Sequence, residues 1–167
     1  DLNVLKITED NLTIENYIIN REQTPFHIAI RKGNLEIVKL MLKKLTDFDI
    51  NVKISEKVFK KPLAYENTLL SIAIQNYDID MVNYFLMNTN VDVNLNSKKM
   101  FSSTSSSPQN EEITPLQFAI TNEDIDMINL LLSQTNIDVN KKSVINSLYD
   151  INQIKSKKTP LFHAIET

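Results

Sequence analysis

Few residues in this chain of 167 residues have the side chains that catalysis or metal binding usually requires. There is no cysteine, which excludes a disulfide framework, a thiolate metal site and a cysteine nucleophile. The only two histidines, His27 and His163, lie far apart in the sequence, and neither is placed with a serine as the base of a nucleophile. The sequence therefore predicts no enzyme, no metal site and no cofactor.

The acidic pairs also have a structural explanation. Asp78 with Asp80, and Asp124 with Asp126, fall at the start of predicted helices, where negative charge offsets the helix dipole. A loop that cradles phosphate needs several glycines, and this chain has one, Gly33. These residues favour helix capping over acid–base or phosphate chemistry.

The overall charge and hydropathy narrow the class of protein. The chain has 18 basic and 21 acidic residues, a net charge of −3, which argues against a nucleic-acid partner. No apolar run approaches the ~18–20 residues of a membrane span. Without cysteine and without a visible targeting segment after Asp1, a cytoplasmic location is expected, with the nucleus left open.

The chain repeats itself at a nearly constant interval. A block that begins with threonine starts at Thr24, Thr68, Thr114 and Thr159, with separations of 44, 46 and 45 residues. Two further blocks follow each complete copy in fixed order. The first blocks read TPFHIAI, TLLSIAI, TPLQFAI and TPLFHAI, the second LEIVKLML, IDMVNYFL and IDMINLLL, and the third DIN, DVN and DVN.

Each block predicts a local structure. The threonine and proline are typical of a helix start, and Asn34, Asp78 and Asp124 are N-cap candidates for a second helix. The second helix has apolar residues on several sides, so we expect it to be covered on several sides. The Asp-x-Asn block and the residues after it alternate apolar and polar, which predicts an extended arm.

These three blocks together resemble the ankyrin repeat. The resemblance implies an all-α repeat solenoid of helix-turn-helix layers with extended β-hairpin or loop fingers. It covers essentially the whole chain, which is expected to be a solenoid fragment of a longer protein. The expected parts are 1–23 (the end of a preceding repeat plus its finger), 24–67, 68–113 and 114–158 (three repeats with fingers) and 159–167 (the first helix of a truncated repeat).

The period departs from the roughly 33 residues of ordinary ankyrin repeats. The excess lies in four fingers, residues 4–23, 52–67, 95–113 and 141–158, and we expect the first, second and fourth to be hairpin arms. The third contains a serine-rich run, 102–107, which is either a mobile tip or a phosphorylation target. The last three fingers have eleven lysines against five acids, either as solvated edge strands or as a basic ridge for an acidic partner.

The resemblance also explains the single glycine. Ankyrin repeats place a glycine between the two helices, where this chain has Gly33, Tyr77 and Glu123. Tyr77 and Glu123 are the strained positions, and a positive φ at either would confirm that the fold overrides local preference. The glycine that follows the second helix is replaced by Asp47, Asn90 and Asn136, which tolerate a left-handed backbone. His27 occupies the position of a structural histidine in the family, and His163 lies one place later.

The resemblance implies a non-catalytic module or scaffold that binds another protein through its concave face and fingers. A monomer is expected in isolation. The alternatives are a recognition or regulatory segment of a larger enzyme or channel chain, and an architectural role without a specific partner. Arg31 is the best candidate for an anchor. The predicted contact residues are Gln23, Arg31, Lys32, Asn67, Gln75, Asn76, Ile113, Thr121, Asn122 and Lys158.

Overall fold

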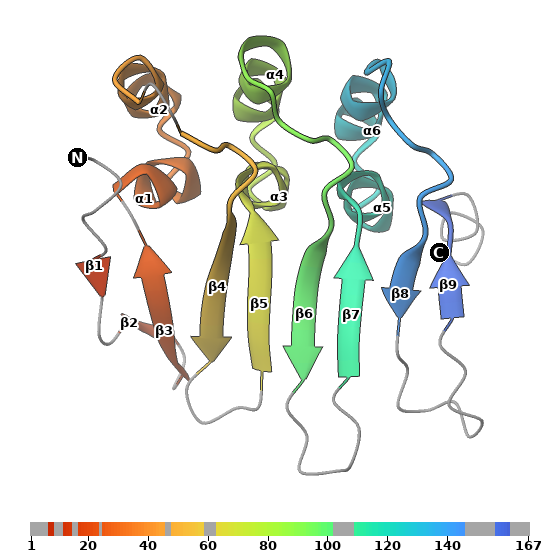
Figure 1. The fold of residues 1–167 in the computed structure, drawn as a ribbon, viewed down its shortest axis with the longest axis horizontal. Coiled ribbons are helices and arrows are strands. Elements are labelled where there is room, and N and C mark those ends of the chain that lie inside the picture. The colour runs from red at the N-terminus through yellow and green to blue at the C-terminus, as the bar shows by residue number, and fades with distance from the viewer. Residues whose placement is uncertain are drawn as a thin grey trace.

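Three helix pairs stand side by side, and a β-sheet extends from one edge of the row (Figure 1). The computed structural model describes residues 7–8, 12–14, 17–23, 25–45, 48–58, 63–101, 109–145 and 156–160. The inner helices, next to the sheet, are α1 (Pro25–Arg31), α3 (Leu69–Gln75) and α5 (Pro115–Thr121). The outer helices are α2 (Leu35–Leu42), α4 (Ile79–Asn88) and α6 (Ile125–Leu132).

Side-chain caps start the helices where the sequence predicts them. The Thr68 and Thr114 hydroxyls accept backbone hydrogen bonds from the third helical residue, and Thr114 forms a full capping box with Gln117. Thr24 lies outside the described residues. The predicted N-caps of the outer helices are confirmed, because each accepts a backbone N–H at 3.0 Å. They are Asn34, Asp78 and Asp124.

The turn between the two helices has the same geometry in every layer. Gly33, Tyr77 and Glu123 have φ values of 66°, 56° and 55°, which confirms the predicted left-handed backbone. In each turn the next residue donates its N–H to the carbonyl of the inner-helix alanine, at 3.0–3.1 Å. This bond closes the end of the inner helix in the manner of a Schellman motif and requires the positive φ.

Replacing Tyr77 with glycine should stabilise the protein. A left-handed backbone costs a residue with a side chain about 1–2 kcal/mol, and the extra freedom of glycine in the unfolded chain offsets part of the gain. We expect a net gain of about 1 kcal/mol, seen as a rise of about 2–4 °C in the melting temperature. Glu123→Gly should give a similar rise. A lower melting temperature for both variants would contradict the strain argument.

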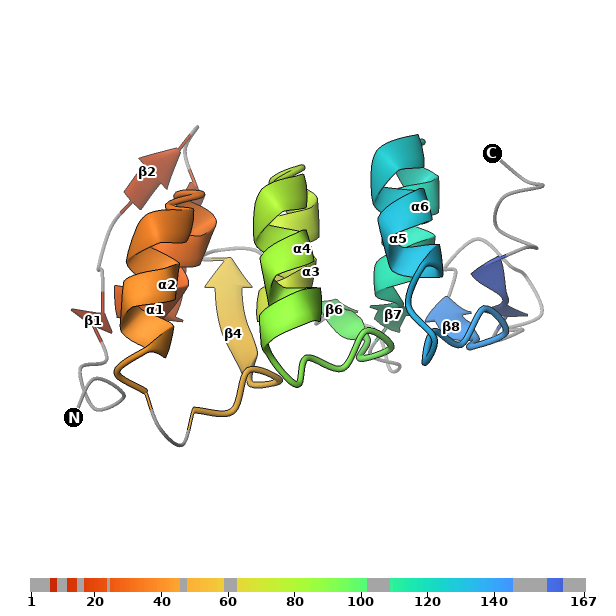
Figure 2. The same ribbon diagram turned by 90° about the horizontal axis from the view of Figure 1, so that it is seen from above.

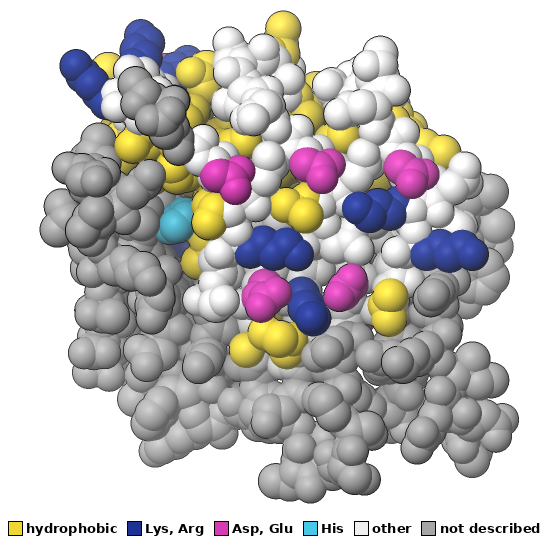
Figure 3. Space-filling view, in the orientation of Figure 1, with side chains coloured by type: hydrophobic (Ala, Val, Ile, Leu, Met, Phe, Trp, Pro, Cys, Tyr) yellow, Lys and Arg dark blue, Asp and Glu magenta, His cyan; other side chains and the backbone are white. Residues whose placement is uncertain are grey.

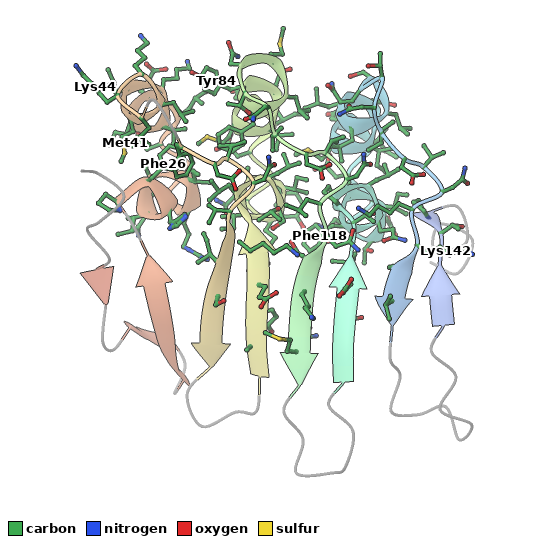
Figure 4. All side chains as sticks on the ribbon, in the orientation of Figure 1. Phe26, Met41, Lys44, Tyr84, Phe118 and Lys142 are labelled. Atoms are coloured by element: carbon green, nitrogen blue, oxygen red, sulfur yellow. The ribbon has the colours of Figure 1, made fainter. Side chains whose placement is uncertain are left out.

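The helix layers share one apolar core, centred on the middle layer. Inner helix α3 packs between α1 and α5. In the outer layer, the Tyr84 side chain points from α4 towards α2, and Lys39 Nζ of α2 lies 5.6 Å from the centroid of its ring (Figure 4). The prediction that the outer helices are covered on several sides is wrong for the first layer. Ile37 is 45% exposed, whereas its equivalents Met81 in α4 and Met127 in α6 are fully buried, because no described helix layer precedes α2.

The fingers pair with one another as well as within themselves. All nine described strands belong to one antiparallel sheet in the order β1-β3-β4-β5-β6-β7-β8-β9, with β2 paired to β3. Hairpins therefore form in part as expected, but they do not stand apart, and all-α is too narrow a class. The strands are β1 (Ile7–Thr8), β2 (Leu12–Ile14), β3 (Tyr17–Gln23), β4 (Lys53–Val58), β5 (Leu63–Thr68), β6 (Ser97–Phe101), β7 (Gln109–Ile113), β8 (Ser143–Ile145) and β9 (Ser156–Lys158).

The Asp-x-Asn block is a turn, so the prediction of an extended arm is wrong for the block itself and confirmed only for the residues after it, where β4, β6 and β8 begin. Each aspartate accepts the N–H of the asparagine two residues later at 2.9 Å, an Asx-turn that gives the same apolar–polar spacing as a strand. The asparagine side chain then bridges to the next layer. Asn94 Nδ2 donates to the Asn136 carbonyl and Asn94 Oδ1 accepts the Asp138 N–H, both at 2.8 Å.

Asn51 makes the same pair of contacts, to the Asn90 carbonyl at 3.2 Å and the Asp92 N–H at 2.6 Å. We refer to Asn51 and Asn94 as the asparagine ladder. Asn90 and Asn136, which would tolerate a left-handed backbone, do not adopt one, and Asp47 lies outside the described residues. The carbonyls of Asn90 and Asn136 are needed as acceptors for the ladder instead.

Candidate protein-binding surface

Four of the predicted contact residues lie in one row of the sheet, beside the inner helices. The strand register pairs Ile54 with Asn67, Ser97 with Ile113 and Ser143 with Lys158, and neighbouring hairpins continue the row. Gln23 ends the adjacent strand β3. The row includes Gln23, Asn67, Ile113 and Lys158 because each of these residues immediately precedes the threonine that opens a repeat.

The described part of this row is largely closed to a partner. Asn67 is only 6% exposed, and its Oδ1 accepts a hydrogen bond from Gln75 Nε2 at 3.2 Å. Figure 2 shows the helices running away from the sheet, so this bond spans the angle between the two. We call the side of the sheet on which this bond lies, together with the helix ends that it faces, the inner face. Asn67 holds this face together through its bond to Gln75, whereas the half-buried side chains of Gln75 and Ile113 are more accessible than that of Asn67.

Sequence reasoning missed the residues of the inner face further along the strands. Tyr65, Lys99 and Glu111 lie opposite one another in the register, two residues from Asn67 or Ile113 and thus on the same face of the sheet. All three are half-buried. The two-residue period of the strands, counted back from the threonines, would have found them.

The lysines of the fingers are balanced by acids across the strands. Lys98 Nζ lies 3.8 Å from Glu112, and Lys99 Nζ lies 3.8 Å from Glu111. Figure 3 accordingly shows basic and acidic side chains intermingled over the sheet. The edge-strand interpretation is wrong for β4 to β7, which are paired on both sides. The described strands do not form a continuous basic ridge.

A hollow of about 440 Å³ lies between the first two inter-helix turns. Predicted residues Arg31, Lys32 and Asn76 line it, together with Tyr77, which is 61% exposed and was not predicted as a contact. The corresponding pair in the third layer, Thr121 and Asn122, lies at the next turn. The structure thus brings the predicted helix-end residues to one border of the inner face.

Arg31 and Asn76 also have structural roles. The Nε and Nη2 atoms of Arg31 are buried, so only part of the guanidinium faces the hollow. Asn76 Nδ2 donates to the carbonyls of Ile30 and Arg31, at 3.2 and 3.1 Å, and so closes the end of α1 from the neighbouring layer. Exposed Lys32 is therefore the more accessible cation of the hollow.

His27 lies on the buried side of α1, so it does not line the hollow. Its pKa is lowered from 6.5 to about 4, first by burial and then by the charge of Arg31. Gln117 occupies the equivalent position in α5, where its side chain closes the capping box. His27 is therefore a neutral, structural side chain, as the sequence predicts. His163 lies outside the described residues.

Substituting His27 with glutamine should remove a pH-dependent loss of stability. Below pH 6.5 the unfolded chain binds a proton that the folded His27 does not, so stability falls as the pH drops towards 4. Between pH 6.5 and about 5, wild type should lose about 1.5 kcal/mol more than His27→Gln. Urea denaturation at both pH values measures the difference. Parallel curves for the two proteins would show that burial does not depress the His27 pKa.

Other features of the described residues do not indicate a second site. A hollow of about 570 Å³ between α2 and α4 contains none of the predicted contact residues. Among the residues that the structure describes, no three His, Asp or Glu side chains are grouped so as to hold a metal ion. No described helix is long and apolar enough to cross a membrane.

Helix pairs stacked in register, each closed by the same turn and bridged by the asparagine ladder, define a helical repeat solenoid. A family model described as Ankyrin repeats (3 copies) matches residues 4–97 and 55–143. The chain belongs to the ankyrin-repeat family. Ankyrin repeats are generally protein–protein interaction modules and typically non-enzymatic. A comparison with curated proteins gave no match.

Proposed function

We propose that this chain is a non-catalytic module that binds a partner protein along its inner face and the turns that border it. The observation that carries the proposal is the hollow at the first two turns, where predicted residues meet exposed Tyr77 at the surface. Tyrosine and charged side chains around a surface hollow are typical of the residues that dominate binding energy. The lack of cysteine supports a cytoplasmic location as part of the same proposal.

Affinity capture with the intact chain, followed by measurement with the captured partner, tests this function. The double variant Arg31→Glu/Lys32→Glu should weaken binding at least about tenfold, because it reverses both cations of the hollow. The matched control is Lys43→Glu/Lys44→Glu, which makes the same charge change at two exposed lysines after α2. Lys44 projects from the outer layer, far from the turns (Figure 4).

Circular dichroism must first show that both double variants keep the wild-type helix content. Equal affinity of the partner for the Arg31/Lys32 variant and for wild type would contradict the proposal. Equal loss in both double variants would also contradict it, because binding would then depend on net charge alone.

A further inference from the structure

The three inter-helix turns display different side chains from one invariant backbone. We call residues 32–34, 76–78 and 122–124 the turn rim. Its central residues Gly33, Tyr77 and Glu123 share the left-handed conformation, which glycine adopts without strain. The tyrosine and glutamate are nevertheless present, and both side chains are exposed. Strain that persists where glycine would serve the fold indicates a use for the side chain outside the fold.

Charge changes sign along the turn rim. The first turn has the exposed cation Lys32 beside Arg31, and the third has exposed Glu123 beside Asp124. Tyr77 stands between them. The hollow next to Tyr77 is open because Gly33 has no side chain: a Cβ there would lie 3.3 Å from Asp78 Oδ2. The rim therefore presents, in order, a cation, an open hollow lined by an aromatic ring and the half-buried N-cap Asp78, and an anion.

We propose that the turn rim reads a charge-segregated segment of the partner protein, acidic opposite Lys32, apolar or aromatic over Tyr77, and basic opposite Glu123. This deepens the proposed function and rests on it. Adjacent helices pack about 8–10 Å apart, so three turns span roughly 20 Å. An extended segment of about six residues covers that distance. The opposed charges fix its direction along the array, and the tyrosine ring supplies a rigid contact of large area.

Selection of random 12-residue peptides displayed on phage against the intact chain tests the assignment. The enriched sequences should have acidic and basic residues separated by about six positions, with an aromatic or large apolar residue between them. Enrichment of uniformly charged or uncharged sequences would overturn the proposal. Failure to enrich any sequence would overturn it as well.

Variants of the rim then separate this inference from the proposed function. The affinity of the most enriched peptide should fall at least about tenfold in Lys32→Glu and in Glu123→Lys, and stay within about twofold in the control Lys44→Glu. Tyr77→Gly should also lose about tenfold in affinity while its melting temperature rises, a combination that a structural role cannot produce.

Wild-type affinity of the peptide for Tyr77→Gly or for Glu123→Lys would overturn the assignment of the rim. If a captured partner protein still depended on Arg31 and Lys32 in that case, the proposed function would stand and only the charge-segregated segment would be wrong. Loss of dependence on Arg31 and Lys32 for the captured partner would instead reject the proposed function itself.

Discussion

Phe85→Ala should destabilise the chain by about 3–5 kcal/mol, the largest effect that we expect from any single substitution discussed. Phe85 is fully buried in α4, in the middle layer of the helical core. Truncation removes most of an aromatic side chain and leaves a cavity that neighbours on both sides cannot fill without moving. Urea denaturation followed by circular dichroism at 222 nm measures the change in free energy of unfolding.

Position-matched substitutions make this prediction specific. Met41 is the equivalent of Phe85 in α2, but it is half-buried and lies on the side of the first layer away from α4 (Figure 4). Met41→Ala should therefore cost only about 1 kcal/mol. Met87→Ala, on the exposed side of α4, should change stability by less than about 0.5 kcal/mol. Equal effects at Met41 and Phe85 would show that the middle layer is no better packed than the first.

Asn94→Ala should cost about 2 kcal/mol, because it removes two hydrogen bonds between layers at once. The Asn136 carbonyl and the Asp138 N–H each lose their side-chain partner. Thermal unfolding and urea denaturation should both show the loss. Alanine removes no apolar contact of comparable size here, so the effect reports on hydrogen bonding.

Asn140 provides the control for the asparagine ladder. It occupies the same place in its Asp-x-Asn block, and its N–H closes the same turn onto Asp138. Its exposed side chain makes no hydrogen bond to any other residue that the structure describes. Asn140→Ala should therefore change stability by less than about 0.5 kcal/mol. A similar loss for Asn94 and Asn140 would show that the bridge between layers contributes nothing.

The helix pairs could be predicted because their signals are local. Thr68 and Thr114 cap the helices that follow them, and the left-handed turns at Tyr77 and Glu123 follow from the alignment of the repeats. Each of these features depends on hydrogen bonds between residues a few positions apart. Local chemistry of this kind is visible in a single repeat.

The strand pairing between fingers could not be predicted in the same way. It joins Tyr65 to Lys99 and Glu112 to Val144, across distances along the chain that periodicity does not report. The Asp-x-Asn block misled because an Asx-turn and a strand share the same alternation of side chains. The bridging role of Asn94 appears only when the neighbouring layer is in place.

The sequence indicated where the candidate contact residues lie better than it indicated which of their side chains are available to a partner. Arg31, Lys32 and Asn76 do meet at one hollow, but Asn76 and part of Arg31 are engaged in holding the layers together. Tyr77 was recognised as a strained turn residue, and its place in the hollow depends on the stacking of two layers. Repeat alignment alone does not show which polar side chains are engaged in contacts with the neighbouring layer.

The continuous sheet links neighbouring repeats by backbone hydrogen bonds, and the number of these links differs from one junction to the next. In a solenoid each layer contacts only its neighbours, and unfolding can start at any weak interface. Here, among the residues that the structure describes, backbone bonds cross between fingers over four register pairs from β5 to β6, three from β3 to β4 and one from β7 to β8. A fracture between the first layers must break the sheet as well as the helix packing. The junction after β7 has the least of this reinforcement, so the array should open from that end first, and the first two layers should melt as one cooperative body.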